Sequence, residues 1–180
     1  MIVTISGIAG SGKSSVARQL AKALGFKHYS VGDLMRTMAE EKGVSLLKLG
    51  EMAETDESID KELDARQVKL GKEGDNFVID SRLGFNFIPK SVEVFLDVSL
   101  DVGAKRILEE GRKNEVYSDV AESVSKIKER IKSEDKRYKS YYDLDYHDAS
   151  HYDLVVDTSE VDVDVVVGKI IDFLESSKVK

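Results

Sequence analysis

The chain contains no cysteine and no tryptophan, and it has one proline and three histidines among its 180 residues. Without cysteine it can form no disulfide, no zinc–thiolate site and no cysteine nucleophile. No apolar run is long enough to span a bilayer, and the N-terminus does not resemble a signal peptide. We therefore expect a globular protein in a cytoplasmic, reducing location.

Positive charge is also scarce overall. The 34 acidic residues outnumber the 27 lysines and arginines, which gives a formal net charge of −7 at pH 7. This balance argues against general binding to nucleic acid or to an anionic membrane, since both favour a basic face. The length suits one domain over residues 1–180. We expect a monomer whose partners are small molecules, with neither nucleic acid nor membrane among them.

What the chain does have is a phosphate-binding loop near its start. Residues 7–14 read Gly-Ile-Ala-Gly-Ser-Gly-Lys-Ser and match G-x-x-x-x-G-K-[ST] in full, between an apolar strand-like run and the helical pattern of residues 16–24. The glycines let backbone N–H groups approach phosphate oxygens. Lys13 supplies charge for the β- and γ-phosphates, and the Ser14 hydroxyl is the expected Mg²⁺ ligand. The residues expected to bind ATP here are Gly7, Ile8, Ala9, Gly10, Ser11, Gly12, Lys13, Ser14 and Ser15.

Strand and helix patterns alternate along the chain. Strand-like runs lie near residues 1–6, 26–29, 77–80, 92–96 and 153–157, with helical patterns between them. Alternation of this kind predicts a parallel sheet with crossover helices. Together with the phosphate-binding loop, this α/β pattern predicts the P-loop NTPase fold. We expect a five-stranded parallel sheet flanked by helices, with a helical insert and a short lid.

Two segments depart from simple alternation. Residues 31–72 are helical throughout, with a break near 55–57, and are too long for a plain crossover. Residues 110–118 form a polar piece between two helices. In a phosphoryl-transfer enzyme such segments close over substrates. For the second segment, a passive surface loop is almost as good an interpretation.

The eight arginines are more informative by position than by number. Arg18 has the spacing of a solvent-facing residue on the first helix. A guanidinium suits phosphate because its fork donates two parallel hydrogen bonds. Any one arginine is explained more simply as a surface ion pair, but the set indicates a second anion site. Seven arginines lie just inside elements that flank the expected nucleotide cleft: Arg36, Arg66, Arg82, Arg106, Arg112, Arg130 and Arg137.

The tightest arginine motif is Arg130-x-x-x-Glu134-x-x-Arg137, whose spacing puts all three side chains on one helix face. We expect Glu134 to hold both guanidiniums in position for a phosphoryl group in transfer. The alternative is an ordinary charged helix with ion pairs four residues apart. Asp80 ends an apolar strand, where it can hold a Mg²⁺-bound water or align an acceptor, or act only as a turn residue.

Histidines and tyrosines near residue 147 carry weaker signals. His147 and His151 have the spacing of a metal pair but lack a Cys or Glu-x-x-His companion, so we interpret them as part of an ordinary loop. The four nearby tyrosines are expected to pack the end of the preceding helix against the sheet. They are Tyr138, Tyr141, Tyr142 and Tyr146.

Taken together, these motifs resemble those of the nucleoside monophosphate kinases, and within them the short cytidylate kinases of archaea. The resemblance covers nearly the whole chain. It rests on the loop, Ser30-Val-Gly-Asp-Leu-Met-Arg36, Asp64-Ala-Arg-Gln67, Val78-Ile-Asp-Ser-Arg82, the Arg130–Arg137 motif and Tyr152-Asp-Leu-Val-Val-Asp-Thr-Ser159. The family pattern at the end of the third strand is Glu-Gly-Arg, whereas this chain has Asp80-Ser81-Arg82.

The resemblance implies Mg²⁺- and ATP-dependent phosphorylation of CMP, and of dCMP, with segment 31–72 binding the acceptor and 110–118 forming a short lid. It implies that Arg36 and Arg82 hold the acceptor phosphate and that Arg106 lies by the donor adenine. The implied catalytic residues are Lys13, Arg112, Arg130 and Arg137. The implied acceptor-site residues are Ser30, Gly32, Asp33, Arg36, Arg66, Asp80 and Arg82, with Asp80 also reaching the metal through water.

Other functions stay open at this point. The acceptor could be AMP, UMP or a non-nucleotide, because base specificity depends on a few hydrogen bonds that one sequence does not place. An adenylate-kinase-like assembly ATPase is the rival from another class. A GTPase switch is excluded, since the chain contains neither Asn-Lys-x-Asp nor Asp-x-x-Gly.

Overall fold

The computed structural model describes residues 1–111 and 117–177. The predicted lid therefore lies largely outside the described residues. In chain order, the elements are β1 (Ile2–Gly7), α1 (Lys13–Leu24), β2 (Lys27–Ser30), α2 (Val31–Glu41), α3 (Leu46–Ala53), α4 (Ser58–Glu73), β3 (Phe77–Asp80), α5 (Gly84–Phe87), β4 (Val92–Asp97), α6 (Leu100–Glu110), α7 (Val120–Tyr142), the 3₁₀ turn η1 (Ala149–His151), β5 (Leu154–Asp157) and α8 (Val163–Ser177).

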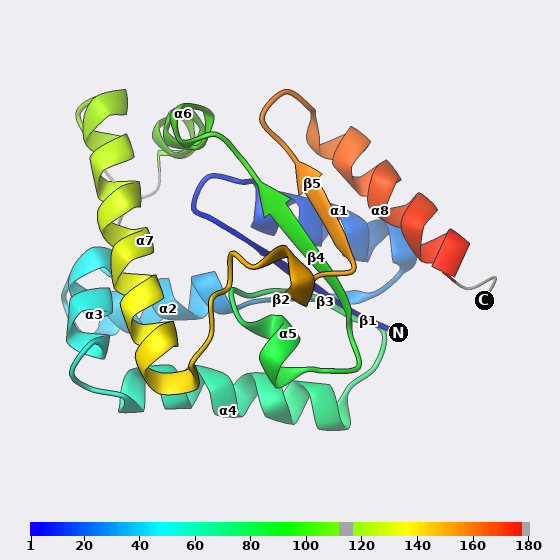
Figure 1. Ribbon diagram of the computed structural model, residues 1–180, viewed down its shortest axis with the longest axis horizontal. Helices are drawn as coiled ribbons and strands as arrows, with labels where there is room; N and C mark the ends of the chain where they lie inside the picture. The colour runs from blue at the N-terminus through cyan, green and yellow to red at the C-terminus, as the bar shows by residue number, and fades with distance from the viewer. Residues whose placement is uncertain (112–116, 178–180) are drawn as a thin grey trace.

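The strands form one five-stranded sheet in the order β2-β3-β1-β4-β5, and every neighbouring pair is parallel (Figure 1). This confirms the predicted parallel sheet. The central strand β1 pairs with β3 and β4, with Ile5 beside Asp80 and Gly7 beside Leu96. Because parallel strands all end at the same edge, the loop after β1 and the residues after β3 meet there.

Each face of the sheet buries a separate apolar cluster. On one face, Val3 and Ile5 of β1 pack with Leu20 of α1 and Ile170 of α8, and Figure 1 shows these two helices side by side. The alternation of side chains along a strand sends other residues to the opposite face. There Phe95 of β4 joins a mostly aromatic cluster with residues of α5, α7 and the chain that follows α7. The sheet is thus covered on both faces, as a parallel sheet requires.

The predicted helical insert folds as three helices, α2, α3 and α4. The gap between α3 and α4 lies at residues 54–57, close to the expected break. These helices share a buried cluster of their own: Met38, Ala39, Leu49, Ala53, Ile59 and Leu63. The Tyr141 hydroxyl of α7 donates to the Ala53 carbonyl at 2.6 Å, which ties α3 to the long helix. The insert therefore has a core and a fixed attachment to the rest of the molecule.

Several helix ends carry the expected capping groups, whereas α4, α5 and α6 begin without a side-chain cap. The Ser30 side chain accepts from the Asp33 N–H at the start of α2, and Gly25 ends α1 in the left-handed conformation. At the start of α7, Asp119 accepts from the Glu122 N–H at 2.8 Å. The two side chains do not form a reciprocal capping box, because the Glu122 carboxylate accepts from the Ser118 N–H and not from that of Asp119.

Two short helical turns, α5 and η1, were not predicted, since single turns are too short to show a period. They meet where Phe85 of α5 stacks on His151 of η1 at 4.7 Å. The other histidine of the predicted pair, His147, has a different neighbour: its Nε2 lies 3.3 Å from Asp135 Oδ1. Tyr138, Tyr142 and Tyr146 pack in the aromatic cluster against the sheet as predicted. The prediction is wrong for Tyr141, whose hydroxyl bonds the Ala53 carbonyl of the insert. No helix in the described part of the chain combines the length and apolarity needed to cross a membrane.

The loop after β1 is held against α6 by a contact between two glycines. Gly10 has φ +80°, and a Cβ added to it would lie 2.3–2.6 Å from backbone atoms of Gly103. Gly12 has a similar φ of +83°, but a Cβ there would meet no atom within 4 Å. The two positions therefore have similar φ angles and differ in the space around them.

Gly10→Ala and Gly12→Ala separate these two effects. Gly12→Ala should lower the free energy of unfolding by about 1–2 kcal/mol, the cost of a left-handed alanine. Gly10→Ala should lose about 1–3 kcal/mol more, because the methyl group overlaps the Gly103 backbone. Urea denaturation followed by circular dichroism measures both. Equal losses would show that the close approach of the loop to α6 is not rigid.

Candidate functional site

The phosphate loop occupies residues 7–12, between β1 and α1. Gly7, Gly10 and Gly12 all have positive φ angles, which the loop needs in order to turn its backbone inward. Lys13 begins α1, and its Nζ donates to the Ile8 carbonyl at 2.6 Å across the loop. The buried Ser11 Oγ has no hydrogen-bond partner among the described residues. The loop thus contains a buried hydroxyl whose hydrogen bonding the described residues do not satisfy.

A cavity of about 470 Å³ extends from this loop toward the helical insert. It lies at the carboxyl ends of β1 and β3, which is where sheets of this kind bind ligands. The elements α1, α2, α4, α6 and α7 contribute to its walls. Among the residues predicted from sequence, those that line it are Ala9, Gly10, Ser11, Gly12, Lys13, Ser14, Ser15, Gly32, Arg36, Asp80, Arg82, Arg106, Arg130, Glu134 and Arg137.

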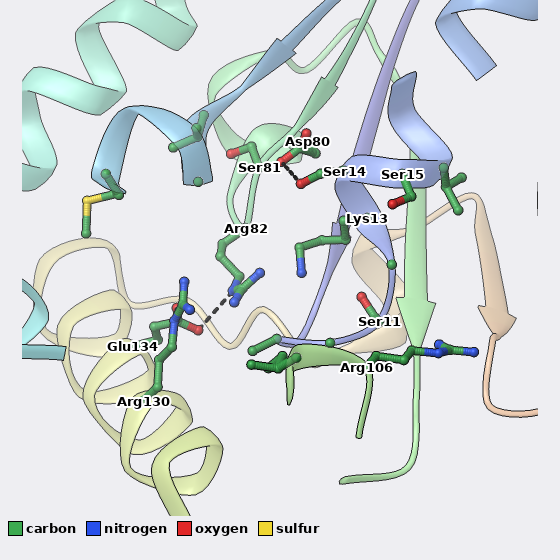
Figure 2. Close-up of a pocket in the computed structure, with 18 of the residues that line it drawn as sticks. Ser11, Lys13, Ser14, Ser15, Asp80, Ser81, Arg82, Arg106, Arg130 and Glu134 are labelled. Atoms are coloured by element: carbon green, nitrogen blue, oxygen red, sulfur yellow. Dashed lines mark hydrogen bonds and ion pairs between the residues drawn. The ribbon is translucent and has the colours of Figure 1, made fainter. Parts of the chain in front are cut away.

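A buried carboxylate, Glu134, organises the cations of the cavity. Its Oε2 accepts from Arg82 Nε at 2.9 Å, and its Oε1 accepts from Arg130 Nε at 3.0 Å (Figure 2). Arg82 Nη1 also donates to the Gly7 carbonyl at 2.6 Å. Burial alone raises the pKa of Glu134, but the charges of Arg82 and Arg130 outweigh burial and hold that pKa well below its usual range. Glu134 is therefore ionised and fixes both guanidiniums.

Positive charge remains in excess around this carboxylate. Figure 2 shows Lys13 and Arg82 pointing into the same space. Burial lowers the pKa of Lys13 well below its usual value, and the neighbouring charges of Arg82 and Arg130 lower it further. An anion bound between these groups would relieve their repulsion. The centre of the cavity is built for negative charge.

Arg137 has a different partner from the one predicted. The prediction that Glu134 holds both Arg130 and Arg137 is wrong for Arg137, whose Nη1 lies 2.6 and 2.7 Å from the two carboxylate oxygens of Asp60 on α4. The second arginine of Glu134 is Arg82, from the end of β3. The reason is that Asp60 of α4 binds the Arg137 guanidinium with both oxygens, while the second oxygen of Glu134 is taken by Arg82. Arg137 still lines the cavity, and its side chain is 4% exposed.

Asp80 is held by side chains from two other elements. Its Oδ1 accepts from Ser14 Oγ at 3.2 Å and from Ser30 Oγ at 2.8 Å. Its Oδ2 lies 2.8 Å from His28 Nε2. Sequence reasoning missed His28, although it stands two residues before Ser30 and so faces the same side of β2. The Ser14 hydroxyl and the Asp80 carboxylate together give hard oxygen donors of the kind that Mg²⁺ prefers.

Arg106 lies in another part of the cavity wall. Its Nη2 donates to the Thr158 carbonyl at 2.7 Å, and its Nη1 donates to Thr158 Oγ1 at 3.2 Å. Figure 2 shows its side chain pointing away from Lys13 and Arg82. Arg106 therefore links α6 to the chain after β5, on the far side of the phosphate loop from the insert.

Several predicted residues do not line the cavity. Gly7 and Ile8 lie beneath it and supply carbonyls to Arg82 and Lys13, and Ser30 supports Asp80. Asp33 is exposed and accepts from Arg36 Nη2 at 2.5 Å. The prediction for Arg66 is not supported by its position, because its side chain is 56% exposed on α4 and bonds Glu62. Arg112 lies outside the described residues.

The structure adds cavity residues that were not predicted. Asp60, Leu63, Asp64 and Gln67 all face the cavity from α4, and Tyr138 faces it from α7. A signal for the four α4 residues was present, since positions separated by three, four and seven residues share a helix face. The polar members of this face lie in the wall formed by the insert.

Comparison with known proteins gives a consistent result. Residues 2–160 match the model of the "Cytidylate kinase-like family". The chain is 40% identical over 168 residues to a cytidylate kinase of Natronomonas pharaonis, covering 92% of this chain and 85% of the relative. It is 39% identical over 178 residues to a cytidylate kinase of Haloarcula marismortui, covering 98% and 90% of the two chains.

Among solved structures, the fold is similar to that of a shikimate kinase from Bacteroides thetaiotaomicron. The TM-score is 0.67, and the match covers 97% of this chain and 98% of the other at 14% identity. At this identity the likeness establishes the fold alone, which is that of a P-loop kinase.

Removing the charge of Glu134 tests the centre of the site. Glu134→Gln leaves Arg82 and Arg130 buried without their counter-charge, and should lower the free energy of unfolding at pH 7 by about 3 kcal/mol or more. Because the folded-state pKa lies below that of the unfolded chain, this loss should shrink as the pH falls below the ordinary glutamate pKa of about 4.3. Urea denaturation at pH 7 and pH 4 measures it.

Glu129→Gln is the matched control, since Glu129 is half-exposed on the same helix and pairs with Lys126. It should change the unfolding free energy by less than about 0.5 kcal/mol at either pH. A Glu134→Gln variant as stable as this control would contradict the role given to Glu134.

Proposed function

The chain belongs to the cytidylate kinase-like family, and we propose that it transfers the γ-phosphate of ATP to CMP, forming ADP and CDP. The observation that carries this proposal is the single cavity that joins the phosphate loop to a second set of arginines. A protein that only binds or hydrolyses ATP needs the first half of this cavity. A kinase with a nucleotide acceptor needs both halves.

The donor triphosphate would bind the backbone N–H groups of the loop, with Lys13 at its β- and γ-phosphates. The Ser14 hydroxyl would be a ligand of Mg²⁺, and Asp80 would reach the ion through a water molecule. Bound there, Mg²⁺ would neutralise charge on the phosphate oxygens. The adenine would lie toward Arg106, because Arg106 and Thr158 form the wall on the side of the loop away from the insert.

The acceptor nucleotide would occupy the half of the cavity that segment 31–72 encloses. Arg36 and Arg82 would bind its phosphate, which places that phosphate opposite the loop. Gly32 lines the same wall, while Ser30 and Asp33 would act indirectly by holding Asp80 and Arg36. In this arrangement the two phosphate groups face each other across Lys13.

In the reaction, an oxygen of the CMP phosphate forms a bond to the γ-phosphorus as the bond from that phosphorus to the β–γ bridging oxygen breaks. The electron pair of the broken bond leaves on ADP. The attacking phosphate is already ionised, so no general base is required. The protein contributes position and charge: Lys13, Arg82 and Arg130 surround the transferred group, and Glu134 keeps the two guanidiniums aimed.

Further parts of the proposal concern residues and properties that rest on the family pattern. Arg137 would complete the set of cations around the transferred group, and Arg112 would join it from a short lid at 110–118. We also propose that dCMP serves as an acceptor and that the protein works as a monomer in the cytoplasm, where its nucleotide substrates are found.

Lys13→Ala tests the catalytic centre. It should lower kcat for CMP phosphorylation by at least about a hundredfold, since it removes a charge that faces the transferred group. Its melting temperature should stay close to that of the unsubstituted protein, because the buried ammonium is already unfavourable there. Arg18→Ala, an exposed arginine of the same helix, is the control and should keep full turnover. Full activity of Lys13→Ala would overturn its role.

A panel of acceptors tests the substrate. With saturating MgATP, kcat/KM should be highest for CMP, measurable for dCMP, and lower for UMP and AMP. A coupled assay for ADP gives all four values on the same protein. A clear preference for AMP, or ADP release that does not depend on any acceptor, would contradict the proposal.

A further inference from the structure

The wall that α4 presents to the acceptor half of the cavity contains three polar side chains. Asp60, Asp64 and Gln67 all line the cavity. Asp60 is already bound to Arg137 through both carboxylate oxygens. Asp64 and Gln67 are therefore the polar groups of α4 available to a ligand, and Leu63 between them gives this wall an apolar surface.

Asp64 is a half-buried carboxylate directed at the cavity. Its Oδ2 accepts a hydrogen bond from the Tyr142 hydroxyl at the end of α7. The pKa of Asp64 is raised to about 6, and burial is the main cause. The charge of Asp60 also raises this pKa, while the Tyr142 hydrogen bond lowers it in part. Tyr142 thus fixes the direction of the carboxylate without neutralising it. The group stands ready to accept a further hydrogen bond.

Gln67 is fixed with its amide nitrogen as the outward donor. Its Oε1 accepts from Ser81 Oγ, and its Nε2 donates to the Leu63 carbonyl at 3.4 Å. The reversed amide would place Oε1 against that carbonyl oxygen, two acceptors facing each other. Because an amide NH₂ carries two protons, Nε2 can make a second hydrogen bond. Ser81, which stands where the family pattern has glycine, supplies the hydroxyl that sets this orientation.

We propose that Asp64 and Gln67 read the edge of the acceptor base and select cytosine over uracil. This proposal rests on the proposed function and deepens it. Asp64 accepts a hydrogen bond from the exocyclic amino group of cytosine, and Gln67 Nε2 donates to its unprotonated ring nitrogen. The two side chains are three positions apart on α4, so their Cβ atoms are about 5–6 Å apart on one helix face.

Uracil reverses both features of this edge. It has a carbonyl oxygen where cytosine has the amino group, and an N–H where cytosine has the bare ring nitrogen. Uracil would therefore set an oxygen against the Asp64 carboxylate and a donor against the Gln67 NH₂. Mismatched pairs of this kind leave buried polar groups unsatisfied, which is how a hydrogen-bonding site rejects an analogue. Adenine shares the amino pattern of cytosine, so this pair discriminates amino bases from keto bases.

Asp64→Asn is the test, with steady-state kinetics for CMP and UMP at saturating MgATP. The asparagine amide can present its NH₂ to the uracil carbonyl, so the ratio of kcat/KM for CMP to that for UMP should fall by at least about tenfold. KM for ATP should not change. Glu73→Gln is the control, since it removes an exposed carboxylate from the same helix, and it should leave the ratio unchanged.

Stability separates this role from a merely structural one. Because the folded-state pKa of Asp64 is raised, its ionised form is unfavourable in the folded protein at pH 7. Asp64→Asn should therefore keep or raise the melting temperature while it alters specificity. Ser81→Ala is a second variant that keeps Asp64 and frees the Gln67 amide to turn. It should lower the same CMP-to-UMP ratio by at least about threefold, which is less than the fall expected for Asp64→Asn.

The outcomes are distinct. Unchanged CMP-to-UMP ratios in both Asp64→Asn and Ser81→Ala, with the unsubstituted chain active on CMP, would overturn this inference and leave the kinase function standing. An equal loss for CMP and UMP would also overturn it, since it would indicate a structural role. An unsubstituted chain that phosphorylates no CMP would overturn the proposed function, and this inference with it.

Discussion

The structure of the cavity depends on one buried carboxylate, Glu134, held between Arg82 and Arg130. Arg82 directly follows β3, the other two groups lie on α7, and Arg82 also binds the Gly7 carbonyl, so the cluster joins the loop, the sheet and the long helix. Without the negative charge, Lys13 and two guanidiniums would repel one another in a confined space. With it, their mutual repulsion is reduced, and the cavity still retains enough positive charge to attract phosphate.

Helix α4 connects this centre to the specificity of the site. Asp60 anchors Arg137 from α7, which fixes the distance between the insert and the phosphate centre. The same face carries Asp64 and Gln67 to the wall of the cavity. Because the insert has its own buried cluster, α4 is a rigid support for these side chains. One helix face thus contributes both to charge placement and to base selection.

The sequence predicted the scaffold well and the side-chain partners less well. The phosphate loop, the parallel sheet and the interruption of the insert were all identified, because glycine positions, strand alternation and helical spacing are local signals. Arg66 shows where this fails: its motif context suggested the acceptor site, but the rotation of α4 leaves it exposed and paired with Glu62. His28 was missed although it stands two residues before Ser30, since that spacing does not by itself mark Asp80 as its neighbour.

The sequence by itself therefore determined the elements, the triphosphate loop and the presence of an arginine-rich second site. Only the tertiary structure decided which acid pairs with which arginine, that Glu134 takes Arg82 and that Asp60 takes Arg137. The physical reason is one of range. Helical periodicity relates residues three or four positions apart, whereas these ion pairs span 52 and 77 residues. Their geometry is set by how α4, α7 and β3 pack, which follows from apolar contacts distributed over the whole chain.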